Sequence, residues 1–110
     1  MLVESQNVKL RIMAPTESAD KIRQVLGEAG AGSQGNYRFC SGSHRQTGRF
    51  MPILGADPAI GQVGEMAAVE EEVIETLCHR DLVEGVLEAV KAAHPYEEPS
   101  IDIIPLLAVQ

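Results

Sequence analysis

The residues with the clearest chemical potential form a short segment near the carboxyl end, HPYEEP, from His94 to Pro99. An imidazole followed closely by two carboxylates can bind a divalent cation or act as an acid–base pair. His94, Glu97 and Glu98 are the candidates for such roles, with His94 and Glu97 as metal ligands. The competing interpretation is structural, because the prolines fix a turn in which His94 binds a carbonyl or carboxylate and Tyr96 packs. A lone histidine falls short of a complete ligand set, so the pattern favours the structural corner.

Two cysteines, Cys40 and Cys78, offer a second kind of chemistry. Cys40 lies four residues before His44, and in a strand both side chains would point the same way, giving a thiolate–imidazole pair. The alternative, which we favour, is that both cysteines are small core residues. Neither belongs to a CxxC pair, so the sequence predicts no disulfide framework and a reducing, cytoplasmic setting.

Composition and the glycine-rich middle exclude other classes of site. The chain has 9 basic and 16 acidic residues, and its scattered arginines predict no nucleic-acid surface. GSQGNY and GADPAIG match neither dinucleotide nor P-loop spacing, so tight turns explain these glycines better than a nucleotide site. The run Glu70–Glu72 is interpreted as a solvated strand edge. No apolar run approaches the roughly 20 residues of a membrane span.

The elements that position these residues follow from periodicity. Residues 8–14 alternate apolar and polar, which predicts a half-buried strand. Thr16 is predicted to cap a helix that ends at Gly30 and Gly32. This helix presents one apolar stripe, formed by Ala19, Ile22, Leu26 and Ala29.

The second half of the chain repeats the alternation of strand and helix. NYRFCS and GRFMPI are predicted to be two short strands joined by a polar SHRQT turn, and a further strand covers residues 69–78. Asp81 and Glu84 form a capping-box variant that begins a second helix, which Pro95 ends. Residues 100–106 form the last strand.

This order predicts an α+β, ferredoxin-like βαββαβ fold with a β-hairpin extension, built as a single domain over residues 1–110. Two helices would cover one face of an antiparallel sheet. The other face would carry Ile104 and Leu106, which are too apolar to stay in water. We therefore expect a homo-oligomer packed sheet to sheet.

Three ordered stretches carry a family resemblance: GAGSQGNYRFCS, GRFMPILGADPAIGQVG and KAAHPYEEPSIDIIPL. Over about residues 9–106 the chain resembles the domain inserted in Nif-three-like dinuclear-metal-centre proteins, and above all its stand-alone bacterial form. The HPY turn is also similar to that of CutA proteins. The resemblance implies the PII/CutA-like variant of the ferredoxin-like fold and a trimer as the favoured assembly.

The resemblance also implies which positions form a family-typical surface. In the full-length family the two metal ions are held by residues outside this region, so the resemblance supplies neither a dimetal ligand nor a catalytic residue. The matching positions are Asn36, Tyr37, Cys40, Gly55, Pro58, Gly61, His94, Pro95, Tyr96, Glu97 and Glu98.

Three functional hypotheses remain. The preferred one is a non-catalytic, oligomeric binding or regulatory module that holds a divalent cation or small molecule between subunits. The second is a small metal-dependent hydrolase that uses His94 with Glu97 or Glu98. The third is a purely structural interaction domain. The ligand-binding candidates are Asn36, Tyr37, Cys40, His94, Tyr96, Glu97 and Glu98.

Overall fold

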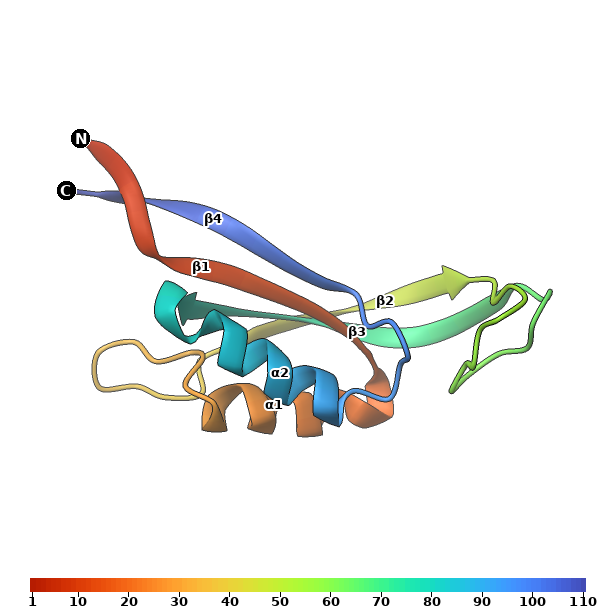
Figure 1. Ribbon diagram of the computed structural model, residues 1–110. Helices are drawn as coiled ribbons and strands as arrows, with labels where there is room; N and C mark the ends of the chain where they lie inside the picture. Colours follow the sequence, from red (N-terminus) through yellow and green to blue (C-terminus); the bar gives the residue numbers. More distant parts are fainter.

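The computed structural model describes residues 1–110. Its elements are β1 (Leu2–Pro15), α1 (Ala19–Glu28), β2 (Gly42–Phe50), β3 (Ala67–His79), α2 (Val83–Ala93) and β4 (Ile101–Val109). A single 3₁₀ turn precedes each helix, η1 (Thr16–Ser18) and η2 (Arg80–Leu82). Both helices lie on one face of the sheet (Figure 1). Neither helix is long and apolar enough to cross a membrane.

The sheet has the order β2-β3-β1-β4, and every neighbouring pair is antiparallel. This arrangement confirms the α+β, ferredoxin-like fold. It also makes β3 an interior strand, so the interpretation of Glu70–Glu72 as a solvated edge is wrong. Glu71 is only 5 % exposed and its carboxylate accepts from Gln46 and Tyr96, whereas Glu70 is exposed.

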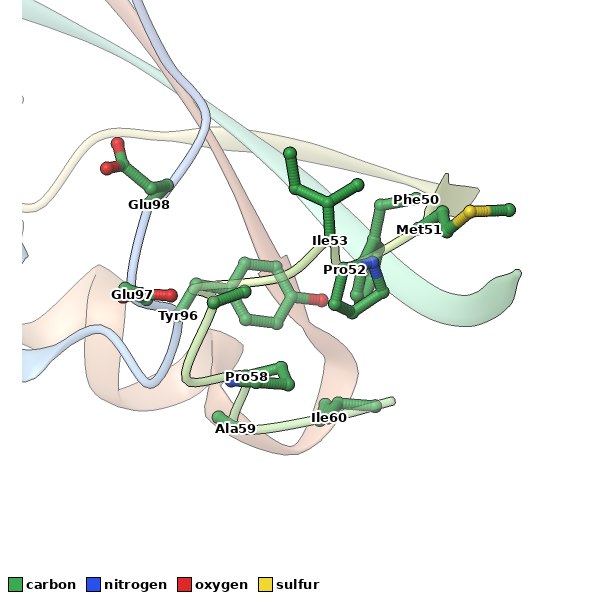
Figure 2. Close-up of a pocket in the computed structure, with 11 residues that line it drawn as sticks. Phe50, Met51, Pro52, Ile53, Pro58, Ala59, Ile60, Tyr96, Glu97 and Glu98 are labelled. Carbon is green, nitrogen blue, oxygen red and sulfur yellow. The ribbon is translucent and has the colours of Figure 1, made fainter. Parts of the chain in front are cut away.

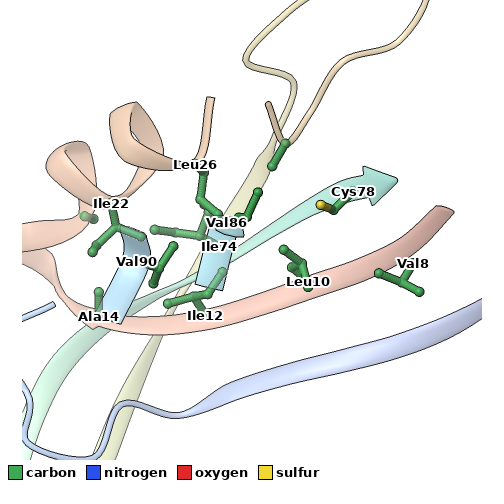
Figure 3. Close-up of a cluster of buried hydrophobic side chains, with 12 residues drawn as sticks. Val8, Leu10, Ile12, Ala14, Ile22, Leu26, Ile74, Cys78, Val86 and Val90 are labelled. Carbon is green, nitrogen blue, oxygen red and sulfur yellow. The ribbon is translucent and has the colours of Figure 1, made fainter. Parts of the chain in front are cut away.

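The core lies between the helices and the sheet face beneath them (Figure 3). Alternate residues of β1 point toward the helices, as the period of two predicted, and the stripe of α1 is buried at Ala19, Ile22 and Leu26. Fully burying an aliphatic side chain of this size contributes about 1.5–3 kcal/mol. The largest fully buried aliphatic side chains of this core are Leu10, Ile12, Ile22, Ile74, Val86 and Val90.

The predicted short hairpin around SHRQT is wrong. Residues 42–50 form one continuous strand, and of NYRFCS only Tyr37 takes part in β-structure, in an isolated bridge with the preceding Gln34. The polar residues of β2 have partners across the sheet: Gln46 donates to Glu71 at 3.0 Å, and Thr47 donates to the Glu70 carboxylate at 3.0 Å. These cross-strand bonds favour a strand where local composition favours a turn. The extension that projects from the body consists of the far ends of β2 and β3 with the 51–66 loop (Figure 1).

The two predicted helix caps are also wrong, although both helices form. Thr16 lies in η1 and donates its hydroxyl to the Glu70 carbonyl at 3.3 Å. Asp81 lies in η2, where its backbone N–H donates to His79 Nδ1 at 3.2 Å. The predicted helix ends are confirmed, since Gly30 has a φ of 104° and His94 is extended before Pro95.

Candidate functional site

His94 anchors the turn that follows α2. Its side chain is only 7 % exposed, Nε2 lies 2.7 Å from the carbonyl oxygen of Met13 in β1, and Nδ1 accepts from the Tyr96 backbone N–H at 3.1 Å. Because Nδ1 accepts a bond, Nε2 carries the proton and donates to Met13. Both ring nitrogens are therefore used to fix the corner, as the structural interpretation of HPYEEP expects.

Tyr96 continues this network into the sheet. Its hydroxyl donates to Glu71 Oε2 at 2.7 Å, and Gln46 donates to the other oxygen of the same carboxylate. Burial of the phenol, together with the hydrogen bond to Glu71, raises the pKa of Tyr96 well above its usual range. Gly48 of β2 leaves room for this carboxylate, since a Cβ there would collide with Glu71 Oε1. The turn after α2 is thus bonded to both β1 and β3.

Next to Tyr96 lies a cavity of about 350 Å³ between the HPYEEP turn and the loop after β2 (Figure 2). The ring of Tyr96 meets Phe50 edge to face, with centroids 6.1 Å apart. Glu97 Oε1 accepts from the Asp57 backbone N–H at 3.0 Å and so ties the turn to the loop. The cavity is lined by Phe50, Met51, Pro52, Ile53, Ala56, Pro58, Ala59, Ile60, Tyr96, Glu97 and Glu98.

The structure divides the predicted site residues between two ends of the molecule. Tyr96, Glu97 and Glu98 line the cavity, and His94 packs beside Tyr96 with ring centroids 5.0 Å apart. The segment 33–41, which contains Asn36, Tyr37 and Cys40, connects α1 to β2 at the opposite end (Figure 1). Within one chain these two groups do not form a common site.

The predicted pairing of Cys40 with His44 by strand parity is wrong, because Cys40 precedes β2. Its backbone is instead bonded to neighbouring segments, with its N–H donating to Gly32 at 2.9 Å and its carbonyl accepting from Thr76 at 2.7 Å. Cys78 is buried, as expected for a core cysteine, and burial raises the pKa of its thiol. No group of three or more histidine, cysteine, aspartate or glutamate side chains is placed to hold a metal ion.

Sequence reasoning missed most of the cavity wall, which comes from residues 50–60. Prolines and glycines correctly indicated a loop there, but the same segment carries apolar residues at Met51, Ile53 and Ile60. The apolar residues between the turn-forming ones were the available signal for a cavity wall, because a loop that is fully exposed to water is expected to carry mostly polar side chains.

The chain is similar to known proteins in sequence and in fold. No protein-family model matches the chain. It is 42% identical over 98 residues to the GTP cyclohydrolase 1 type 2 homolog of Halalkalibacterium halodurans, covering 89% of this chain and 26% of that protein. The chain thus spans about a quarter of the length of the curated relatives it matches.

Solved structures show the same relationship. A Bacillus cereus protein related to NIF3 superposes with a TM-score of 0.79 at 38% identity, over 96% of this chain and 26% of that one. The periplasmic divalent cation tolerance protein CutA from Archaeoglobus fulgidus has a TM-score of 0.66 at 24% identity, over 91% and 83% of the two chains. The chain therefore has the α+β fold of the CutA, PII-like proteins. It is related, over nearly all of its own length, to the NIF3-like proteins, and the resemblance noted in the sequence is confirmed.

Proposed function

We propose that this chain is a non-catalytic binding module that acts as a homo-oligomer and holds a small ligand in the cavity between the 51–66 loop and the HPYEEP turn. The cavity carries this proposal. Its volume of about 350 Å³ lies within the range of roughly 300–1,000 Å³ typical of small-molecule sites. Seven of its eleven lining residues are hydrophobic, and a mostly apolar wall with a few polar groups is the usual composition of such sites.

Preorganisation supports the same proposal. Three contacts hold the walls in place: His94 to Met13, Tyr96 to Glu71, and Glu97 to the Asp57 amide. Each contact joins segments that lie more than twenty residues apart in the chain. Walls that are fixed before binding reduce the entropy that a ligand must overcome.

The lining residues support binding in preference to catalysis. They include no serine, threonine, cysteine, histidine or lysine, and the hydroxyl of Tyr96 is already bonded to Glu71. A hydrolase mechanism would need His94 as the base, yet both of its nitrogens hold the backbone. A divalent cation bound by His94 and Glu97 would likewise require the imidazole to give up one of these bonds.

The test is an NMR titration of the ¹⁵N-labelled protein with 2-phenylethanol, a small neutral aromatic probe. We expect chemical-shift changes confined to the amides of residues 50–60 and 95–98. The variant Ala59→Trp fills the cavity and should abolish these changes, whereas Ala68→Trp, at an exposed position of β3, should preserve them. Shifts confined to other parts of the chain would contradict the proposed site.

A homo-oligomer is proposed because one sheet face has no helices over it. Ile104 pairs with Lys9, and neither residue shares the face of Leu10 and Ile12 that the helices cover. Ile104 and Leu106 are both only partly buried in one chain. The PII/CutA-like resemblance favours a trimer in which these faces meet.

A further inference from the structure

We propose that the ligand of this cavity is an organic cation with an aromatic or apolar body, such as an arylalkylamine. The inference rests on the proposed function and adds the chemical class of the ligand. Three features of the cavity carry it: the sign of its charges, the aromatic groups on its wall, and its size.

The charges of the lining are all of one sign. Glu97 and Glu98 are the two carboxylates of the wall, and no lysine or arginine lines it. A phosphate or carboxylate ligand would meet only like charge, next to an apolar wall that strengthens the repulsion. A cation instead gains charge-assisted hydrogen bonds.

The carboxylates have free acceptor capacity. Only one oxygen of Glu97 is bonded, to the Asp57 amide, and Glu98 has neither a hydrogen bond nor an ion pair. Both belong to the turn that His94 fixes and lie on the same side of Tyr96, where the Glu97 carboxylate is directed toward the ring and that of Glu98 away from it (Figure 2). An ammonium group has up to three donors for these acceptors.

The aromatic wall suits a cation as well. Tyr96 and Phe50 form an edge-to-face pair, and ring faces attract cations through their quadrupole. The Tyr96 hydroxyl donates to the Glu71 carboxylate, which polarises the phenol and makes its ring more electron-rich. A volume of about 350 Å³ holds roughly twelve groups of the size of water, enough for one ring and a short alkylamine chain.

The test compares three probes of nearly equal shape at pH 7: 2-phenylethylammonium, 2-phenylethanol and phenylacetate. In NMR titrations of the intact chain we expect the ammonium probe to bind roughly tenfold more tightly than the alcohol, as one additional charge-assisted contact predicts. Phenylacetate should bind more weakly than the alcohol. Added salt should weaken binding of the ammonium probe and leave that of the alcohol unchanged.

Matched variants locate the effect. Glu98→Gln and Glu97→Gln should each reduce the preference for the ammonium probe severalfold. The amide that replaces the Glu97 carboxylate keeps an oxygen that can accept from Asp57, so the turn stays tied to the loop. Glu84→Gln, at an exposed position of α2, should leave the preference intact. Equal affinity for ammonium and alcohol would overturn the cation assignment while the binding module stands. Binding of none of the three probes would overturn both proposals.

Discussion

At the scale of single residues, His94 holds the end of α2 against β1. Its two hydrogen bonds are both to backbone groups, and the ring is nearly buried. Removal of the ring leaves the Met13 carbonyl and the Tyr96 amide without these partners. An unsatisfied buried polar group costs about 1–3 kcal/mol.

The variant His94→Ala should therefore lower the free energy of unfolding by about 1–3 kcal/mol in urea titrations. It should also weaken probe binding, because the loosened turn carries three residues of the cavity wall. His44→Ala is the matched control: His44 is exposed on β2, and its replacement should change stability by less than about 0.5 kcal/mol. An equal loss of stability in the two variants would show that the hydrogen bonds of His94 do not stabilise the turn.

Tyr96 predicts a dependence of stability on alkaline pH. Its pKa is raised in the folded chain, so its contribution is fully present below the pKa of an unfolded tyrosine, about 10, and is lost as pH rises above that value. Tyr96→Phe removes the bond to Glu71 and should cost about 1–2 kcal/mol at neutral pH. The difference between wild type and variant should then shrink above about pH 10. A difference that stays constant up to about pH 11 would contradict this assignment.

At the scale of elements, the packing of β2 against β3 depends on the space that Gly48 leaves for the Glu71 carboxylate. Gly48 lies across from Val69 and leaves space for Glu71, whose oxygens accept from Gln46 and Tyr96. This close approach places a buried acid on the face of the sheet that the helices leave open. It also links β2 to the turn after α2, because Gln46 and Tyr96 share the Glu71 carboxylate.

Gly48→Ala tests this fit. The added methyl group must displace the Glu71 carboxylate and so disturb both of its hydrogen bonds, which should lower stability by about 1–3 kcal/mol. Gly42→Ala lies in the same strand, where an added Cβ meets nothing within 4 Å, and should be neutral or slightly stabilising. Thermal unfolding of the two variants compares them directly, and similar midpoints would argue against a role for Gly48.

At the scale of the whole molecule, the chain is elongated, with extents of 50 × 26 × 24 Å. Its radius of gyration of 15.4 Å exceeds the roughly 13 Å expected for a compact chain of this length. The open face of the sheet combines apolar side chains with a ladder of charges, in which Arg11 pairs with Asp102 at 3.0 Å and with Glu75 at 4.0 Å. These half-exposed pairs add little stability in one chain, but they would set the register of a face-to-face contact.

Light scattering at micromolar concentration tests the assembly. We expect a mass near three times 11.9 kDa for the wild type. Ile104→Glu should shift the mass to that of one chain, because it places a charge in the proposed interface. Ile103→Glu, one residue earlier and on the opposite face of β4, should keep the oligomer. A monomeric wild type would rule out the assembly, and dissociation by Ile103→Glu alone would move it to the other face.

The fold class and the helix-ending role of HPYEEP were determined by the sequence, because they follow from short-range rules. The period of two in the first strand predicted the burial of Leu10 and Ile12, and the helical period predicted that of Ile22 and Leu26. The proline that follows His94 excluded the helical conformation at His94. Where an assignment depended on partners across the sheet, local reasoning failed. SHRQT forms a strand because Glu70 and Glu71 accept its hydrogen bonds, and the sequence does not show which segments will pair.

The location of the candidate site was decided only by the tertiary structure. The cavity joins residues 50–60 to residues 96–98, and α2 and β3 lie between them in the chain. No local pattern indicates that these segments meet, since their contact depends on the pairing of β2 with β3 and on the bonds of Tyr96 to Glu71 and of Glu97 to Asp57. The same packing separated Cys40 from His94 and engaged both nitrogens of the imidazole. Residue types thus determined which chemistry was available, and long-range packing determined where it came together, because contacts between distant segments form only when the whole sheet is assembled.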